Sequence, residues 1–242
     1  MIIGAVTLLG LAKGGFAGVG MVATPMMALV IPPLQAAAIF LPILLVQDVI
    51  SVWAYRRDWD PWNLKVMMPG SVIGIVVAWA LAAYLSDTVV RLAIGLIGIA
   101  FVLNSWFSKT SIEPKTPNAA AGVFWGGVSG FTSFLSQAGG PPFQVHVLPQ
   151  RLPKLTLVGT STIFFSIVNA LKIGPYFALG QFSTINFATS LVLLPIAVAA
   201  NALGIWLVRV TPVETFYKIA YTLVFCVSVM LLWQGVTGLM RG

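Results

Sequence analysis

Long apolar stretches make up most of the chain, and two of them are broken near the middle by glycines. Ile2–Ile31 is interrupted at Lys13–Gly20, which leads to Thr24-Pro25. Ala119–Leu148 is interrupted at Ser129–Gly140, which leads to Pro141-Pro142. Glycine and proline punctuate helices because glycine frees the backbone and proline cannot continue a helix interior. The pattern predicts two broken helical segments at corresponding places in two halves of the chain.

Between the broken segments the apolar runs are continuous and have the length of membrane-crossing helices. About 20 apolar residues cross a hydrocarbon core of roughly 30 Å. Runs of this length are too long for the strands of a membrane barrel, so they are expected to be helices. The predicted spans are 34–55, 64–85, 88–107, 155–171, 183–208 and 213–234.

Composition agrees with a lipid environment. The chain is 59% hydrophobic and 8% charged, whereas soluble domains carry about 25% charged residues. The fold class predicted is therefore an all-α polytopic membrane protein.

An internal repeat extends beyond the glycines. Pro33 and the span after it match Pro153 and the span after it, and Pro69 matches Pro195. We expect one transmembrane domain, 1–242, made of repeat 1 at 1–107, a polar linker at 108–117 and repeat 2 at 118–242.

The distribution of basic residues between the two sides of the membrane distinguishes two topologies. If each broken segment crosses the membrane once, seven basic residues lie on one side and five on the other. If each is a hairpin, nine lie on one side and three on the other, the three being Arg91, Lys172 and Arg241. The positive-inside rule favours the hairpins. The sequence therefore predicts two inverted repeats, each a re-entrant hairpin plus three transmembrane helices. Both termini are expected outside, and the linker in the cytoplasm. Short tilted spans in place of the re-entrant arms remain an open alternative.

Hairpin tips of this kind can bind an anion. Interrupted hydrophobic segments at matching positions point to a transporter's binding site, and free N–H groups at a helix start attract negative charge. The predicted contacts are the backbone near Gly18, Gly20, Gly139 and Gly140, and the side chain of Gln137. The alternative is that the small residues only let helices pack closely.

Lys13 is the most costly residue to bury. An ammonium deep in a membrane costs about 2.5–3.5 kcal/mol or more, so it needs a partner. Asp48 lies at comparable depth on the next span, with Gln47 beside it. The sequence predicts a Lys13–Asp48 pair that either contacts the substrate or a coupling ion, or serves packing alone.

A stripe of polar residues in the second half of the chain also needs partners inside the membrane. Asn169 occupies, within one residue, the position that corresponds to Asp48, and Thr162, Ser166 and Asn169 recur at helical spacing on one face. Such a stripe faces a pathway or makes interhelical hydrogen bonds. His146 could relay protons or be a hydrogen-bonded interface residue.

Several functional classes lack their residues. One cysteine, Cys226, and one histidine make a metal or redox cofactor site improbable, and no cofactor is expected. There is no GxxxxGK[ST] motif for ATP, and no catalytic constellation. The formal net charge of +7 contains no basic run suited to nucleic acid.

The Gly14–Gly20 break, its second copy at Ala138–Pro142, and the Lys154–Thr162 run resemble the TauE/SafE family of membrane permeases over nearly the whole chain. The resemblance implies a bacterial-type inner-membrane secondary transporter that exports sulfite or organosulfonates such as sulfoacetate. An anion channel is the alternative function, and a membrane-embedded enzyme is a third one. The sequence leaves open whether the protein is a homodimer, and it does not identify the exact substrate, the coupling ion or the direction of transport.

Overall fold

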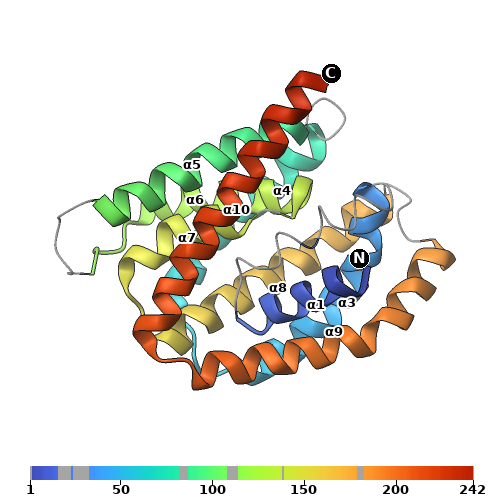
Figure 1. Ribbon diagram of the computed structural model, residues 1–242, viewed down its shortest axis with the longest axis horizontal. Coiled ribbons are helices and arrows are strands. Elements are labelled where there is room, and N and C mark those ends of the chain that lie inside the picture. The colour runs from blue at the N-terminus through green and yellow to red at the C-terminus, as the bar shows by residue number, and fades with distance from the viewer. Residues whose placement is uncertain are drawn as a thin grey trace. The chain divides into compact units, whose positions relative to one another are not determined.

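In the computed structural model every described element is helical (Figure 1). The structure describes residues 2–15, 23, 33–81, 87–107, 114–137, 139–178 and 183–241. Among them, α4 (Pro61–Leu81), α8 (Lys154–Ala178), α9 (Thr184–Val210) and α10 (Val213–Arg241) are long and apolar enough to cross a membrane. Shorter apolar helices accompany them. The all-α polytopic class is confirmed.

The chain forms two compact units that each combine pieces of both predicted repeats. Unit 1 consists of Met1–Pro61 and Lys154–Phe216, and unit 2 of Trp62–Pro153 and Tyr217–Gly242. The division of the chain into repeats and a linker stays a prediction.

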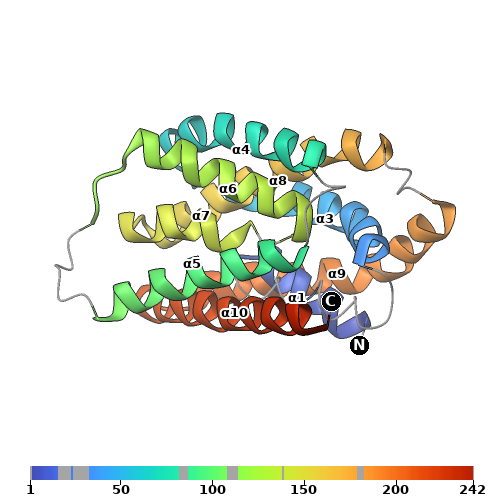
Figure 2. The same cartoon turned by 90° about the horizontal axis from the view of Figure 1, so that it is seen from above.

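Unit 1 contains α1 (Ile2–Lys13), α3 (Pro33–Tyr55), α8 and α9. The short helix α1 runs along α9, and α3 packs against both α8 and α9 (Figures 1 and 2). Buried apolar side chains of α1, α3 and α9 form the core of unit 1. The buried members include Ala5, Val6, Leu9, Phe40, Ile43, Leu44, Leu193 and Ala197.

Small residues allow α1 and α9 to pack at a short distance from each other. A Cβ on Gly10 would lie 2.6 Å from Cβ of Ala200, and a Cβ on Gly14 would lie 2.5 Å from Cα of Gly204. Both pairs follow the four-residue spacing of small residues by which membrane helices approach closely. The approach brings the end of α1, and Lys13 with it, into the interior of unit 1.

Unit 2 contains α4, α5 (Asp87–Phe107), α6 (Ala119–Ser136), α7 (Gly140–Val147), the 3-10 turn η2 (Leu148–Gln150) and α10. The helices α4 and α6 lie side by side (Figure 2), with Gly70 and Gly74 of α4 directly against the backbone of α6. The helices α5 and α10 pair in the same manner, with Gly95 against Ser228 and Leu232. Unit 2 thus repeats the small-residue packing of unit 1.

The second broken segment returns to the side on which it started. The amide of Lys115, before α6, donates to the carbonyl oxygen of Pro149, after α7, at 2.9 Å. The chain therefore leaves this segment where it entered it, as a hairpin does. The break itself is shorter than predicted, because Ser129–Ser136 is helical and the helix ends only at Gln137.

Contacts inside unit 1 help to distinguish the two topologies, in which each broken segment is either a single crossing or a hairpin. A guanidinium nitrogen of Arg209 lies 3.4 Å from the carbonyl oxygen of Ala54, and Nζ of Lys154 lies 2.5 Å from that of Thr211. The end of α3, the start of α8 and the end of α9 therefore meet at one end of unit 1. The single-crossing reading puts Arg56 and Arg57 opposite Lys154 and Arg209, so these contacts disfavour it.

Unit 2 gives the same result. The hydroxyl of Tyr217, near the start of α10, donates to the carbonyl oxygen of Leu152 at 2.5 Å. Arg91, near the start of α5, instead donates to the side chain of Gln234 near the end of α10, at 3.0 Å. These pairings agree with the hairpin reading, and the inverted symmetry of the halves stays a prediction.

One span is longer than the sequence indicated. The predicted 155–171 is part of α8, which continues to Ala178 through Pro175. Lys172 therefore lies inside a helix and is fully buried. Its assignment to the outer side stays a prediction.

Candidate functional site

An ion pair lies at the centre of unit 1. Nζ of Lys13, the last residue of α1, is 2.5 Å from Oδ1 of Asp48 in the middle of α3. The two side chains are 12% and 6% exposed, so the pair is largely shielded. The predicted contact is present, and its role in transport stays a prediction.

The polar stripe of α8 completes the coordination of Asp48. The hydroxyl of Ser166 donates to Oδ1 of Asp48 at 2.8 Å, and Nδ2 of Asn169 donates to Oδ2 at 2.8 Å. The same hydroxyl also lies 2.7 Å from the carbonyl oxygen of Thr162, which is buried one turn earlier. Asp48 thus receives donors from both predicted repeats of the chain.

A second lysine belongs to this cluster. Nζ of Lys172 lies 3.3 Å from Oδ1 of Asn169, and no part of the side chain of Lys172 is exposed. The charges of Lys13 and Asp48 both act on it. The sequence did not single out Lys172, although its three-residue spacing from Asn169 puts both on one helical face.

Gln47 points to a different neighbour from Asp48. Its Nε2 donates to the carbonyl oxygen of Ala197 at 2.8 Å, and its backbone oxygen accepts from Nδ2 of Asn201 at 3.2 Å. The hydroxyl oxygen of Ser51 lies 3.1 Å from Oδ1 of Asn201. These bonds fasten α3 to α9, and the predicted involvement of Gln47 with substrate or coupling ion stays untested.

The end of α1 is held by side chains of α3. The last carbonyl groups of a helix have no partner within the helix. Ser51 donates to the carbonyl oxygen of Lys13 at 3.0 Å, and the hydroxyl of Tyr55 donates to that of Gly14 at 2.6 Å. Gly15 then takes φ 135°, a conformation that glycine adopts without strain. The position of Lys13 is therefore fixed on both its backbone and its side chain.

The break in unit 2 has a defined geometry. Gln137 is left-handed, with φ 56° and ψ 22°, and its amide donates to the carbonyl oxygen of Thr132. The hydroxyl of Ser129 lies 2.7 Å from the carbonyl oxygen of Gly139, across the turn. Helix α7 begins directly afterwards at Gly140, so Gln137, Gly139 and Gly140 lie together at the turn.

Prolines limit what the start of α7 offers an anion. The first four N–H groups of a helix have no partner within it, but Pro141 and Pro142 have no N–H. The amide of Phe143 donates to the carbonyl oxygen of Gly139. Gly139 and Gly140 are the residues at this terminus that have an N–H before the prolines, and both residues are buried.

The predicted site between the two hairpin tips stays a prediction. Gly18 and Gly20 lie outside the described residues, and Gln137, Gly139 and Gly140 belong to unit 2 whereas Lys13, Asp48, Thr162 and Asn169 belong to unit 1. Unit 1 alone brings together the charged members of the predicted site.

His146 stacks on Trp62, with ring centroids 6.4 Å apart. Its Nε2 is buried and has no hydrogen-bond partner among the described residues, whereas the neighbouring side chains of Asn63 and Gln150 bond to each other at 2.8 and 3.0 Å. A proton relay through His146 stays a prediction.

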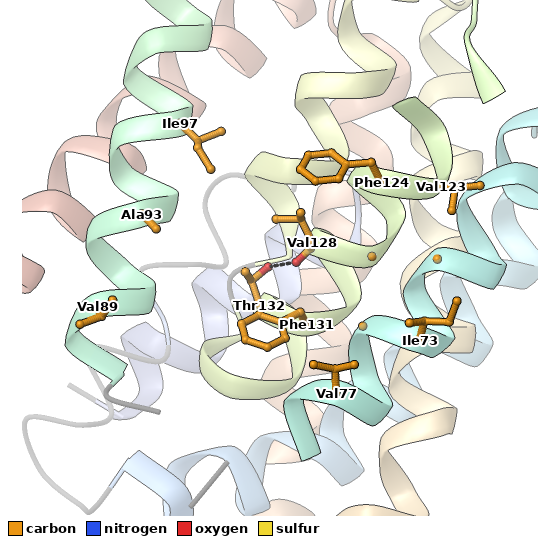
Figure 3. Close-up of a pocket in the computed structure, with 13 residues that line it drawn as sticks. Ile73, Val77, Val89, Ala93, Ile97, Val123, Phe124, Val128, Phe131 and Thr132 are labelled. Atoms are coloured by element: carbon orange, nitrogen blue, oxygen red, sulfur yellow. Dashed lines mark hydrogen bonds between the residues drawn. The ribbon is translucent and has the colours of Figure 1, made fainter. Parts of the chain in front are cut away.

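A groove of about 570 Å³ lies among α4, α5 and α6 of unit 2 (Figure 3). Its lining is almost entirely apolar, with Ile73, Val89, Phe124 and other aliphatic groups. The hydroxyl of Thr132 donates to the carbonyl oxygen of Val128 instead of facing a ligand, as the dashed line in Figure 3 shows. An anion has no partner in this groove, so the charged cluster of unit 1 is the better candidate.

Comparison with known families decides the class of protein. The model of the family described as sulfite exporter TauE/SafE matches residues 2–231. The chain belongs to this family. It is therefore a multi-pass membrane protein of a transporter family, and the resemblance seen in its glycine motifs is confirmed. We find no match to a curated protein or to a solved structure.

Proposed function

We propose that this TauE/SafE protein is a secondary transporter, acting as an exporter of a small sulfur-containing anion such as sulfite or an organosulfonate. Export of sulfite is what the family description names. The proposal for this chain rests on one observation above all: a buried Lys13–Asp48 pair, with Lys172 one side chain away, inside a helical unit that has an apolar core.

The physical argument concerns the cost of buried charge. A charged residue within the membrane marks a substrate or ion pathway by default, because packing alone could be achieved with apolar groups. The ammonium of Lys13, with the side chain of Lys172 one residue away in the same cluster, is a group that an anion can bind. An arriving anion can replace Asp48 as the partner of Lys13 without leaving the ammonium unpaired.

Neutral groups would complete the site. Thr162 and Asn169 lie on the face of α8 that Asp48 contacts, and they would donate to substrate oxygens when Asp48 moves. At the break of the second hairpin, the amides of Gly139 and Gly140 and the side chain of Gln137 are further proposed contacts, together with the backbone near Gly18 and Gly20.

For the membrane arrangement we propose the cell inner membrane, with the linker 108–117 in the cytoplasm and both termini outside. The inequality of basic residues in the loops supports this orientation. It would also concentrate anions at the cytoplasmic mouth, from which an exporter takes its substrate.

Competition for transport in proteoliposomes tests the substrate class. The purified full chain is reconstituted, and uptake of labelled sulfite is measured with sulfonates, sulfate, carboxylates and neutral amides as competitors. Sulfonates should compete and neutral amides should not. Equal competition by neutral amides would contradict an anion site.

A further inference from the structure

Asp48 is the acidic residue that the chain places inside an apolar run. The chain has six Asp and Glu residues, and the other five lie at the ends of the apolar runs or between them: Asp58, Asp60, Asp87, Glu113 and Glu214. Asp48 instead lies in the middle of α3, and its side chain is almost fully buried. Buried carboxyl groups of membrane helices commonly mark a path for protons, because they change their charge by binding one proton.

Three donors hold this carboxylate, and each of them is a group that an anionic substrate could also bind. Nζ of Lys13 lies 2.5 Å from Oδ1 of Asp48, and the hydroxyl of Ser166 donates to the same oxygen at 2.8 Å. Nδ2 of Asn169 donates to Oδ2 at 2.8 Å. The carboxylate of Asp48 therefore occupies the place of an anion in the proposed site, and a substrate that binds Lys13 arrives beside a second negative charge.

The helices packed against α3 carry few ionisable groups. Apart from Lys13 of α1, these are Lys154, Lys172 and Tyr176 of α8 and Arg209 of α9. Lys172 reaches Asp48 through the intervening amide of Asn169, and Arg209 lies near the end of α3, against Ala54. The segment 16–32 lies mostly outside the described residues and contains no ionisable side chain. Among the described residues, Lys13 is the cation in direct contact with Asp48.

We propose that Asp48 takes up one proton when the substrate anion binds to Lys13, so that the protein carries one proton together with each anion. This proposal rests on the proposed function and adds the coupling ion to it. The proton comes from the water on the side from which the anion enters, and it binds a carboxylate oxygen of Asp48. It leaves that oxygen when the anion is released.

The physical reason is the repulsion between two negative groups that share one cation. In a buried site such groups do not both stay ionised, and one of them binds a proton. A sulfonate is the conjugate base of a strong acid, so the proton goes to the carboxyl group of Asp48. The protonated carboxyl can still accept from Asn169 and can donate to an oxygen of the anion. A monoanion and its proton together carry no net charge, so transport should be electroneutral.

The first test measures binding to the full-length protein at several pH values. Methanesulfonate is the probe, because it stays a monoanion over the whole range and any dependence on pH therefore comes from the protein. Binding is read as the ligand-dependent rise in melting temperature. Because the bound state holds one proton more than the free state, affinity should rise as the pH falls, by up to about tenfold per pH unit.

The second test follows protons in proteoliposomes that contain a pH-sensitive dye. Inward flow of methanesulfonate through the wild-type protein should acidify the lumen. A membrane potential set by potassium and valinomycin should leave the rate of flow unchanged, because the transported pair is neutral. Flow that responds to the potential and leaves the luminal pH constant would contradict a coupled proton.

An Asp→Asn exchange separates the proton from the anion. The amide of D48N is neutral at every pH, as a protonated carboxyl is, so its affinity for methanesulfonate should not depend on pH. D58N is the matched control. It makes the same exchange just after α3, where the amide of Asp58 donates to the carbonyl oxygen of Tyr55, and it should keep the pH dependence of the wild type.

The outcomes distinguish the coupling from the proposed function. An affinity of the wild type that is independent of pH would overturn the proposal. A dependence that persists in D48N would overturn it as well, because another group would then bind the proton. If D48N does not fold, the two wild-type measurements decide alone. A wild-type protein that binds and transports no anion at any pH would instead refute the proposed function.

Discussion

Nδ2 of Asn169 on α8 lies 2.8 Å from Oδ2 of Asp48 on α3, and these residues occupy corresponding positions in the two predicted repeats. The amide is oriented by this bond, because its nitrogen faces the carboxylate and its oxygen faces Lys172. One neutral side chain thereby links the acidic and basic members of the cluster.

Asn169→Leu should impair transport more than it impairs folding. The variant loses an interhelical hydrogen bond worth about 1–2 kcal/mol in a membrane, and it removes the acceptor of Lys172. Sulfonate transport and the melting temperature are measured together. Asn201→Leu is the control, because Asn201 fastens α3 to α9 without contacting Asp48 in the structure. Similar transport per folded protein in both variants would argue against a special role for Asn169.

Single and double variants separate the contribution of the Lys13–Asp48 pair to stability from its contribution to transport. Asp48→Asn should lower the melting temperature in anion-free buffer, because breaking a buried pair costs about 3–5 kcal/mol. Replacing both partners, as Lys13→Met with Asp48→Leu, should recover most of that stability. The double variant should nevertheless not transport sulfonate. Wild-type transport by it would show that the pair serves packing only.

Part of this site could be predicted from the sequence. Lys13 interrupts an apolar arm, and a deep ammonium restricts its partner to the few carboxylates at similar depth, which singled out Asp48. The helical spacing of Thr162, Ser166 and Asn169 likewise indicated one polar face, and the structure turns Ser166 and Asn169 toward Asp48.

Other parts depend on packing between distant segments. The apolar run ends at Leu171, which predicts the end of the span there, yet the helix continues to Ala178 and includes Lys172. Gln47 is adjacent to Asp48 in the sequence. Successive side chains of a helix point about 100° apart, however, and Gln47 bonds to α9. The partners Ser51 and Asn201 lie in different halves of the chain, so no local pattern joins them.

Close packing of α1 on α9 predicts strict limits at Gly10. A Cβ there would lie 2.6 Å from Cβ of Ala200 and 2.7 Å from the carbonyl oxygen of Ala197. Gly10→Leu should therefore separate the helices, displace Lys13 and lower the yield of folded protein. Gly174→Ala in α8 is the control, since no atom of the described residues lies within 4 Å of its added Cβ. This variant should be neutral or more stable by about 0.5–1 kcal/mol, because alanine favours a helix interior. Comparable yields for both glycine variants, read by fluorescence-detected size exclusion, would contradict the packing.

Cysteine accessibility can test the proposed orientation. In a Cys226→Ser background, single cysteines at Arg57, Lys115 and Pro212 should all be labelled from the cytoplasmic side, and one at Thr88 from the outside. The structure groups the end of α3 with the end of α9, and Lys115 with Pro149. Labelling of positions 57 and 212 from opposite faces would restore single crossings for the broken segments.

Counterflow of sulfite through the reconstituted wild-type protein, compared with Lys13→Gln, tests the central claim most directly. Proteoliposomes loaded with unlabelled sulfite should transiently accumulate labelled sulfite, with saturation, because a carrier exchanges substrate across one site. Lys13→Gln should lose this exchange while remaining folded by size exclusion. Unsaturable flux without counterflow would indicate a channel, and wild-type counterflow in Lys13→Gln would contradict the assignment of the buried cluster as the anion site.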